Sequence, residues 1–204
     1  MVAEHSLVPS PSLTRIKRFY ITEQTVLAVD LEERFLGVWA FLESLAWFVA
    51  VDYALFFMGL KEPDRWKHWL AVTAAGSAIG IITHYLLVLS YPASMQSMLH
   101  STPLVQSSMV DAAQSNLASL HMVFLQAYTF IPVKVWTFLV PNTPISFPLF
   151  FIVVMSGRLT RWLLVIGVVK GLNTIDNRFS EEWYPLVSFV WTVFFFGLIL
   201  FLET

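Results

Sequence analysis

The sequence FLESLAWFVAVDYALFFMGL, residues 41–60, decides the fold because it embeds two carboxylates, Glu43 and Asp52, in an apolar stretch. Three basic residues are embedded in apolar stretches further along the chain: Lys134, Arg158 and Arg161. A charge in hydrocarbon is energetically costly, so it is usually paired or faces an internal aqueous cavity, and it marks a functional site by default. The five residues therefore indicate a polytopic membrane protein with an ionisable interior.

The composition favours the same class. Of the 204 residues, 57% are hydrophobic and only 13% are charged, whereas soluble domains are about 25% charged. This length suits one membrane domain. Cysteine is absent, which excludes disulfides and thiolate metal sites. The net charge of -2 gives no reason to expect binding to nucleic acid.

Catalytic and metal-binding patterns are missing from the sequence. His68, His84 and His121 lack the H-x-x-x-H spacing of a zinc site, and a lone histidine is more often a hydrogen-bonded packing residue than a proton relay. No Ser-His-Asp set, glycine-rich phosphate loop or paired-carboxylate hydrolase pattern is present. We therefore expect a protein that is not an enzyme and that holds no metal or cofactor.

The apolar residues fall into five blocks: about 35–60, 69–91, 119–141, 144–169 and 185–202. A spanning helix needs about 20 mostly apolar residues, which the second, fourth and fifth blocks provide. Residues 1–34 are polar and lack the apolar core of a secretory signal. We expect them to form a cytoplasmic arm with a short surface helix around 22–34, and residues 35–204 to form the membrane domain.

The first and third blocks predict re-entrant hairpins, which enter and leave the membrane by the same face. Nine positions turn a helix by roughly 180°, so Glu43 and Asp52 would face opposite ways on one continuous helix. A break near residues 47–50 would turn both toward a shared interior. Pro132 interrupts the third block because proline removes a backbone donor. Such irregular backbone is tolerated at depth when it is buried in protein or lines a water-filled cavity.

Loop charges give the orientation. Basic residues precede the first block, follow it, and separate the fourth from the fifth, whereas residues 92–118 contain no Lys or Arg. The positive-inside rule places these three basic regions in the cytoplasm. A re-entrant first block keeps both of its basic flanks on that side. The prediction is an all-α polytopic membrane protein with three transmembrane helices and two inverted re-entrant helical hairpins.

Two halves of the chain together resemble one known family. The first half combines Glu43, Asp52 nine positions later, a basic loop, and a helix of the form GS-x-x-G at Gly76, Ser77 and Gly80. The second half combines P-x-K-V-x-T with G-R-x-x-R-W: Pro132, Lys134, Val135, Thr137, Gly157, Arg158, Arg161 and Trp162. In this order, over about residues 38–170, the motifs resemble a divergent member of the DedA superfamily. This superfamily is also called the VTT or SNARE-associated Golgi domain, and the likeness is to its YqaA-type branch.

This resemblance implies a transporter whose two inverted hairpins meet at the midplane of a bacterial inner membrane. Family members are implicated in moving undecaprenyl phosphate or phosphatidylethanolamine with dependence on the proton gradient, and eukaryotic relatives act as lipid scramblases. Membrane lipids are therefore the expected partners. Where the family places prolines between its acidic residues, this chain has residues 48–51, FVAV, and it has Pro141 and Asn142 where the family tends to glycine.

The embedded charges suggest the chemistry of transport. Burial raises and a nearby Arg lowers a carboxylate's pKa, so Glu43 and Asp52 are candidate proton carriers. Arg158 and Arg161 share a helix face and suit phosphate oxygens, with Lys134 as a further point charge. One alternative is a static ion-pair cluster that fixes hairpin packing. Another is that Arg158 and Arg161, above all Arg161, lie near the cytoplasmic end of their helix and merely snorkel to the membrane surface.

Two interpretations of function follow. The first is a translocase for a lipid or lipid-phosphate, with proton coupling. The second, motivated by the missing prolines and glycine, is a structural subunit of a larger membrane complex with an idle pocket. The expected assemblies of the chain are a larger membrane complex or a homo-oligomer. In either, Gly76 and Gly80 permit close helix contact, which we expect to be with the chain's own helices, and Gly157 precedes the first arginine.

Overall fold

The computed structural model describes residues 31–45, 50–101, 105–129 and 131–175, except for the side chains of residues 173 and 175. Contacts divide the chain into two units, Met1–Phe35 and Leu36–Thr204, and the second unit holds every element discussed below except residues 31–35 of the first helix. Within the described ranges the regular structure is helical throughout and contains no strand, as the sequence predicts. The surface helix expected around 22–34, as far as residue 30, and the span expected at 185–202 lie outside the described residues.

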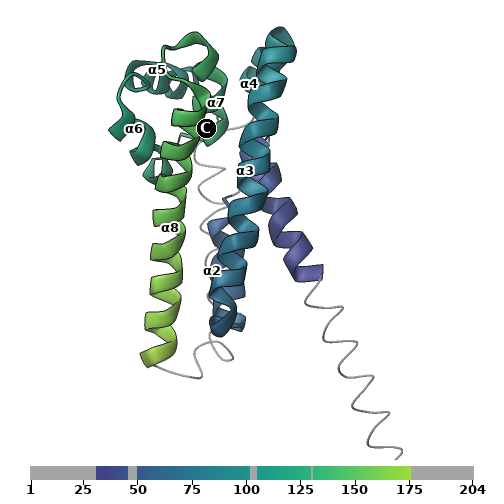
Figure 1. Ribbon diagram of the computed structural model, residues 1–204, viewed down its shortest axis with the longest axis vertical. Helices are drawn as coiled ribbons and strands as arrows, with labels where there is room; N and C mark the ends of the chain where they lie inside the picture. The colour runs from purple at the N-terminus through teal and green to yellow at the C-terminus, as the bar shows by residue number, and fades with distance from the viewer. Residues whose placement is uncertain (1–30, 46–49, 102–104, 130, 176–204) are drawn as a thin grey trace, which may run out of the picture. The chain divides into compact units, whose positions relative to one another are not determined.

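The first half of the described chain is a broken helix followed by a long one (Figure 1). The helix at residues 31–45 is followed, after an interruption at Ala50 and Val51, by a separate helix. The spacing of Glu43 and Asp52 predicts a break near residues 47–50, and an interruption is present there at Ala50 and Val51. Residues 46–49 are not described. The later elements are α2 (Asp52–Lys61), η1 (Pro63–Arg65) and α3 (Trp66–Ser90).

Small residues allow the helix at residues 31–45, which is the first arm of this half, to pack closely against α3. A Cβ added to Gly76 would collide with the carbonyl oxygen of Gly37 and lie 3.1 Å from the Cβ of Ala40. Further along both helices, a Cβ on Gly80 would lie 2.5 Å from the carbonyl oxygen of Phe41. Residue numbers rise together on the two helices, so the first arm runs parallel to α3. The expected contact of these glycines with the chain's own helices is confirmed.

The second half repeats the same order of elements. A short helical arm ends near Tyr128, extended backbone follows at Thr129 and Pro132, and a second arm begins at Val133. Proline cannot continue a helix from the preceding turn, which accounts for the position of this break. The elements are α6 (Leu120–Leu125), η2 (Gln126–Tyr128), α7 (Val133–Leu139), η3 (Val140–Asn142) and α8 (Phe147–Ile175).

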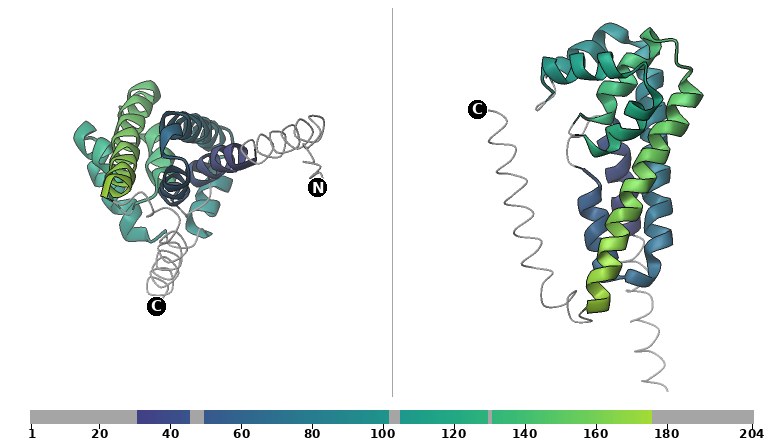
Figure 2. Two further views of the ribbon diagram at one scale, coloured as in Figure 1. Left: turned by 90° about the horizontal axis from the view of Figure 1, so that it is seen from below. Right: turned by 90° about the vertical axis from the view of Figure 1, so that its left-hand side faces the viewer.

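The two long helices run antiparallel along the molecule (Figure 2). Tyr85 near the end of α3 stacks on Phe147 at the start of α8, with ring centroids 3.8 Å apart. At the opposite end, the Lys170 ammonium of α8 lies 4.4 Å from the ring centroid of Trp66. The second arm of each half packs against the long helix of the other half, α2 on α8 and α7 on α3. The halves are therefore interlocked and inverted.

Residues 92–118, expected as a loop, contain two helices instead, α4 (Pro92–Ser101) and α5 (Ser107–Asn116). Their buried apolar residues recur at helical spacing, Met95 with Leu99 and Ala113 with Leu117, which is the periodicity of an amphipathic helix. The mostly polar composition of this segment hides that period in the sequence. Both helices pack against α7 at the end of the molecule where α3 ends.

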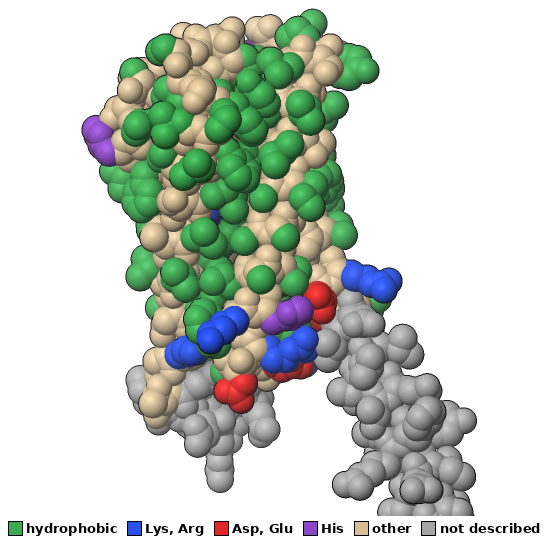
Figure 3. Space-filling view, viewed as in Figure 1, with side chains coloured by type: hydrophobic (Ala, Val, Ile, Leu, Met, Phe, Trp, Pro, Cys, Tyr) green, Lys and Arg blue, Asp and Glu red, His purple; other side chains and the backbone are tan. Residues whose placement is uncertain are grey.

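Two described helical segments are long and apolar enough to cross a membrane, Pro63–Ser90 and Phe147–Leu172. Only 33% of the residues in each apolar window are buried, whereas a core helix of a soluble protein is mostly buried. Figure 3 shows hydrophobic side chains along the length of the molecule and charged ones gathered at the end where α3 begins. This distribution supports membrane insertion.

Candidate functional site

The first ion pair of the site joins the two halves of the chain. Arg158 of α8 donates through Nη2 to Oε2 of Glu43 over 2.6 Å, and the two side chains are only 3% and 11% exposed. The Arg158 guanidinium also lies 5.1 Å from the ring centroid of Trp162, one turn further along α8. A buried charge-assisted hydrogen bond of this length is among the stronger polar contacts in proteins.

The second ion pair is bidentate. Arg161 donates through Nε to Oδ1 of Asp52 over 3.0 Å and through Nη2 to Oδ2 over 2.6 Å. Its Nη1 donates to the carbonyl oxygen of Ala127, 2.5 Å away at the end of the second half's first arm. Arg161 therefore bonds to residues of both halves of the chain at once. The interpretation of Arg161 as a snorkelling side chain is wrong, because its guanidinium is engaged inside the molecule.

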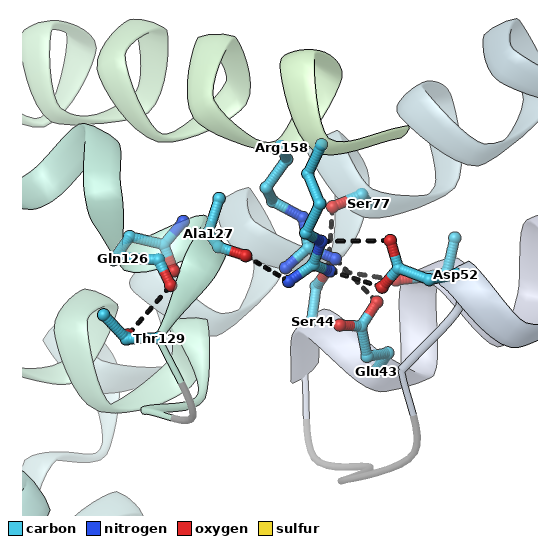
Figure 4. Close-up of polar contacts among 10 residues, drawn as sticks. Glu43, Ser44, Asp52, Ser77, Gln126, Ala127, Thr129 and Arg158 are labelled. Carbon is cyan, nitrogen blue, oxygen red and sulfur yellow. Dashed lines mark hydrogen bonds and ion pairs between the residues drawn. The ribbon is translucent and has the colours of Figure 1, made fainter. Parts of the chain in front are cut away.

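Both carboxylates reach the same helix because the first half is broken between them. Glu43 lies near the end of the 31–45 arm and Asp52 is the first residue of α2, on the far side of the interruption (Figure 4). Arg158 and Arg161 stand three positions apart on α8 and present their guanidiniums to the same hairpin. The predicted convergence of these four charges on a shared interior is confirmed.

Lys134 is the fifth predicted charge, and it lies on α7, directly after the proline break. Its side chain is completely buried. The ammonium interacts electrostatically with Glu43 and with His84 of α3. The cluster thus draws on both hairpins and both long helices.

Hydroxyl and imidazole groups brace the first hairpin. Ser44, the neighbour of Glu43, donates to the carbonyl oxygen of Ala40 and lies 2.9 Å from the hydroxyl of Ser77 on α3. His84 Nδ1 lies 2.9 Å from the carbonyl oxygen of Leu45. A carbonyl only accepts, so Nδ1 carries the proton. The sequence singled out Ser77 through its motif and His84 as a packing residue, but gave no sign of the role of Ser44.

In the second half of the chain, a glycine of the long helix allows a close helix contact and a proline precedes the second arm. A Cβ on Gly157 would collide with the carbonyl oxygen of Phe124 and lie 3.4 Å from Ala127. Pro132 directly precedes α7 in extended conformation. Gly157 therefore gives the first arm of this hairpin its close approach to α8, as Gly76 and Gly80 do on α3.

One buried polar side chain beside the site is not among the predicted site residues. Gln126 is 3% exposed, and its amide nitrogen has no hydrogen-bond partner in the described part of the chain. It lies beside Ala127, whose carbonyl oxygen binds Arg161. A glutamine in an apolar block carries no charge to draw attention, so the sequence offers only its polarity as a signal.

The charged side chains of the site can bind an anion and protons without a metal ion or cofactor. Two guanidiniums and an ammonium can hold an anion, and two carboxylates can hold protons or occupy the guanidiniums themselves. Among the described residues no cluster of three or more His, Cys, Asp or Glu could hold a metal ion. No protein-family model, curated protein or solved structure matches the chain.

Proposed function

We propose that the protein is a DedA-like integral membrane protein that translocates a lipid or lipid-phosphate across a bacterial inner membrane, with proton coupling. The observation that carries this proposal is the pair of Arg–carboxylate bridges between α8 and the first hairpin, Arg158 with Glu43 and Arg161 with Asp52. An ion-pair cluster inside a largely apolar molecule is what a transport or relay site in a membrane requires.

Proton coupling follows because the cargo and the two carboxylates compete for the same arginine side chains. The anionic head group of the cargo and the two carboxylates need the same guanidinium donors, because an Arg fork binds either a carboxylate or a phosphate. Protonation of Glu43 and Asp52 removes their charge and releases Arg158 and Arg161 to the cargo. Loss of the protons on the other side of the membrane restores the ion pairs and expels the head group.

The proposed topology has three spans and two re-entrant hairpins. The spans are α3, α8 and the apolar block at 185–202, and the hairpins are the interrupted helices that carry Glu43 and Lys134. The basic side chains Arg65, Lys67 and Lys170 lie at one end of the long helices, which supports a cytoplasmic location for that end. The N-terminal arm would then also be cytoplasmic.

Reconstitution tests this function. Full-length protein in liposomes would be given a fluorescent phospholipid or a polyprenyl phosphate, and its movement between leaflets would be followed with and without an imposed pH gradient. We expect gradient-dependent movement by the wild type and its loss in Glu43→Gln, Asp52→Asn and Arg158→Ala. Glu62→Gln is the matched control, because Glu62 forms an ion pair with Arg65 at 3.0 Å that is outside the cluster and partly exposed. Transport that survives all three site substitutions would end the mechanism.

The second candidate function is a structural subunit of a larger membrane complex. It is favoured by the same ion pairs, which are closed and fasten the first hairpin to α8, and by the absence of prolines from residues 48–51. Purification in mild detergent separates the two candidates. A chain that runs alone or as a homodimer counts against the subunit role, whereas a stable complex with other proteins favours it.

A further inference from the structure

The two halves of the chain can be aligned on a contact that both contain, in which a glycine of the long helix approaches a carbonyl oxygen. In the first half of the chain, this glycine is Gly80. A Cβ on Gly80 of α3 would lie 2.5 Å from the carbonyl oxygen of Phe41 and 2.8 Å from the Cβ of Ser44. Glu43, which directly precedes Ser44, is therefore placed one residue from this contact. Its carboxylate accepts from Arg158.

The second half repeats this contact with different side chains. A Cβ on Gly157 of α8 would meet the carbonyl oxygen of Phe124 and, at 3.4 Å, the Cβ of Ala127. Phe124 thus corresponds to the phenylalanine of the first half, and Ala127 to its serine. Gln126, which directly precedes Ala127, takes the position that Glu43 has in the first half.

A second pair of contacts supports the correspondence. His84 lies one helical turn after the glycine of α3 and donates to the carbonyl oxygen of Leu45. Arg161 lies one turn after the glycine of α8 and donates to the carbonyl oxygen of Ala127, one residue earlier in the arm than the position that matches Leu45. In both halves, a polar side chain of the long helix thus caps the end of the first arm.

The exchange of a carboxylate for an amide changes what this position can bind. Gln126 carries no charge and offers two N–H donors, whereas Glu43 can only accept when ionised. Among the residues that the structure describes, neither the buried Gln126 amide nitrogen nor Nε of Arg158 has a hydrogen-bond partner. Gly157, directly before Arg158, packs against the arm that carries Gln126. A buried donor without an acceptor costs about 1–3 kcal/mol, so each of these two donors would be stabilised by an oxygen of a ligand or of water.

We propose that Gln126 is a cargo-binding residue, which donates from its amide nitrogen to a phosphate oxygen that Arg158 also holds. The first half of the chain then binds the protons through Glu43 and Asp52, and the second half binds the anion. The choice of a lipid phosphate as the ligand rests on the proposed function. A phosphate monoester fits because it offers several acceptor oxygens and complements the excess positive charge of the cluster.

Binding of decyl phosphate to the full-length protein in neutral detergent tests this assignment, with inorganic phosphate as a second arm. The readouts are the dissociation constant from titration calorimetry and the ligand-dependent rise in Tm. Gln126→Leu removes the donors at similar size, and its binding should weaken by roughly tenfold or more, as expected for loss of a hydrogen bond to a charged group. Gln114→Leu, a substitution of an exposed glutamine on α5, should bind as the wild type does.

Gln126→Glu keeps the assignment testable if the leucine variant fails to fold. It retains the shape of the side chain but replaces the donors with a carboxylate, and it should weaken binding at least as much. Tighter binding of decyl phosphate than of inorganic phosphate indicates a lipid head group, and the reverse indicates free phosphate; both support the assignment when they depend on Gln126. Unchanged affinity in both Gln126 variants, or no binding by the wild type, overturns it. Binding without translocation would refute the proposed function alone.

Discussion

Breaking the buried ion pair between Arg158 and Glu43 should destabilise the protein far more than removing both of its charges. Arg158→Met leaves the Glu43 carboxylate, which is 11% exposed, without its guanidinium partner at 2.6 Å. Removal of one partner from a buried pair costs about 3–5 kcal/mol, because the remaining charge stays desolvated. The double variant with Glu43→Gln leaves no charge behind and should recover at least about 2 kcal/mol of that loss.

A double-mutant cycle measured by reversible unfolding in mixed detergent micelles gives the coupling free energy directly. The control cycle uses Glu62→Gln and Arg65→Met, whose ion pair at 3.0 Å is 27% and 34% exposed. Exposed pairs of this kind couple by about 0.2–1 kcal/mol. A coupling energy for Arg158 and Glu43 no larger than that of the control would refute the claim that these charges meet in a sheltered interior.

The contacts around the site yield three further predictions. Gly157→Ala should cost about 1–3 kcal/mol of unfolding free energy, because its Cβ meets backbone, whereas Gly167→Ala, with open space around it, should be stabilising by up to about 1 kcal/mol in the same assay. Equal effects of the two would contradict the close helix contact. Arg161→Lys keeps the charge but loses the bidentate fork and the backbone bond, so lipid translocation should fall while net charge is unchanged; wild-type rates would contradict this role. Ser44→Ala should cost about 1–3 kcal/mol because it leaves the Ser77 hydroxyl unpaired, and the double alanine variant should cost less than the sum of the two single ones, as judged by unfolding.

The charged residues within the apolar blocks were sufficient to predict which side chains lie close together in the structure. Glu43 and Asp52 could not share one side of an unbroken helix, so their spacing required a break, and the structure has an interruption at Ala50 and Val51. Arg158 and Arg161 share a face because three positions are nearly one helical turn. The sequence could not specify which arginine pairs with which carboxylate, since that depends on the packing of α2 against α8.

Other features were beyond the sequence for a physical reason. The helices at 92–118 are mostly polar, and their weak apolar period was hidden by the loop-like composition. Gln126 became a candidate only after Gly157 and Gly80 were found in matching contacts, because the correspondence between the halves lies in backbone packing rather than in shared residue types. Tertiary contacts of this kind carry information that a single sequence with two divergent halves does not show.

Proton uptake on anion binding tests the competition between cargo and carboxylates most directly. Decyl phosphate would be added to the detergent-solubilised protein in weakly buffered solution, and the protons bound per anion would be measured with a pH indicator. We expect the wild type to take up about one more proton for each of Glu43 and Asp52 than the Glu43→Gln, Asp52→Asn double variant, whose proton exchange is that of the probe alone. The double variant should also bind the anion more tightly. Proton exchange by the wild type equal to that of the double variant would refute the competition.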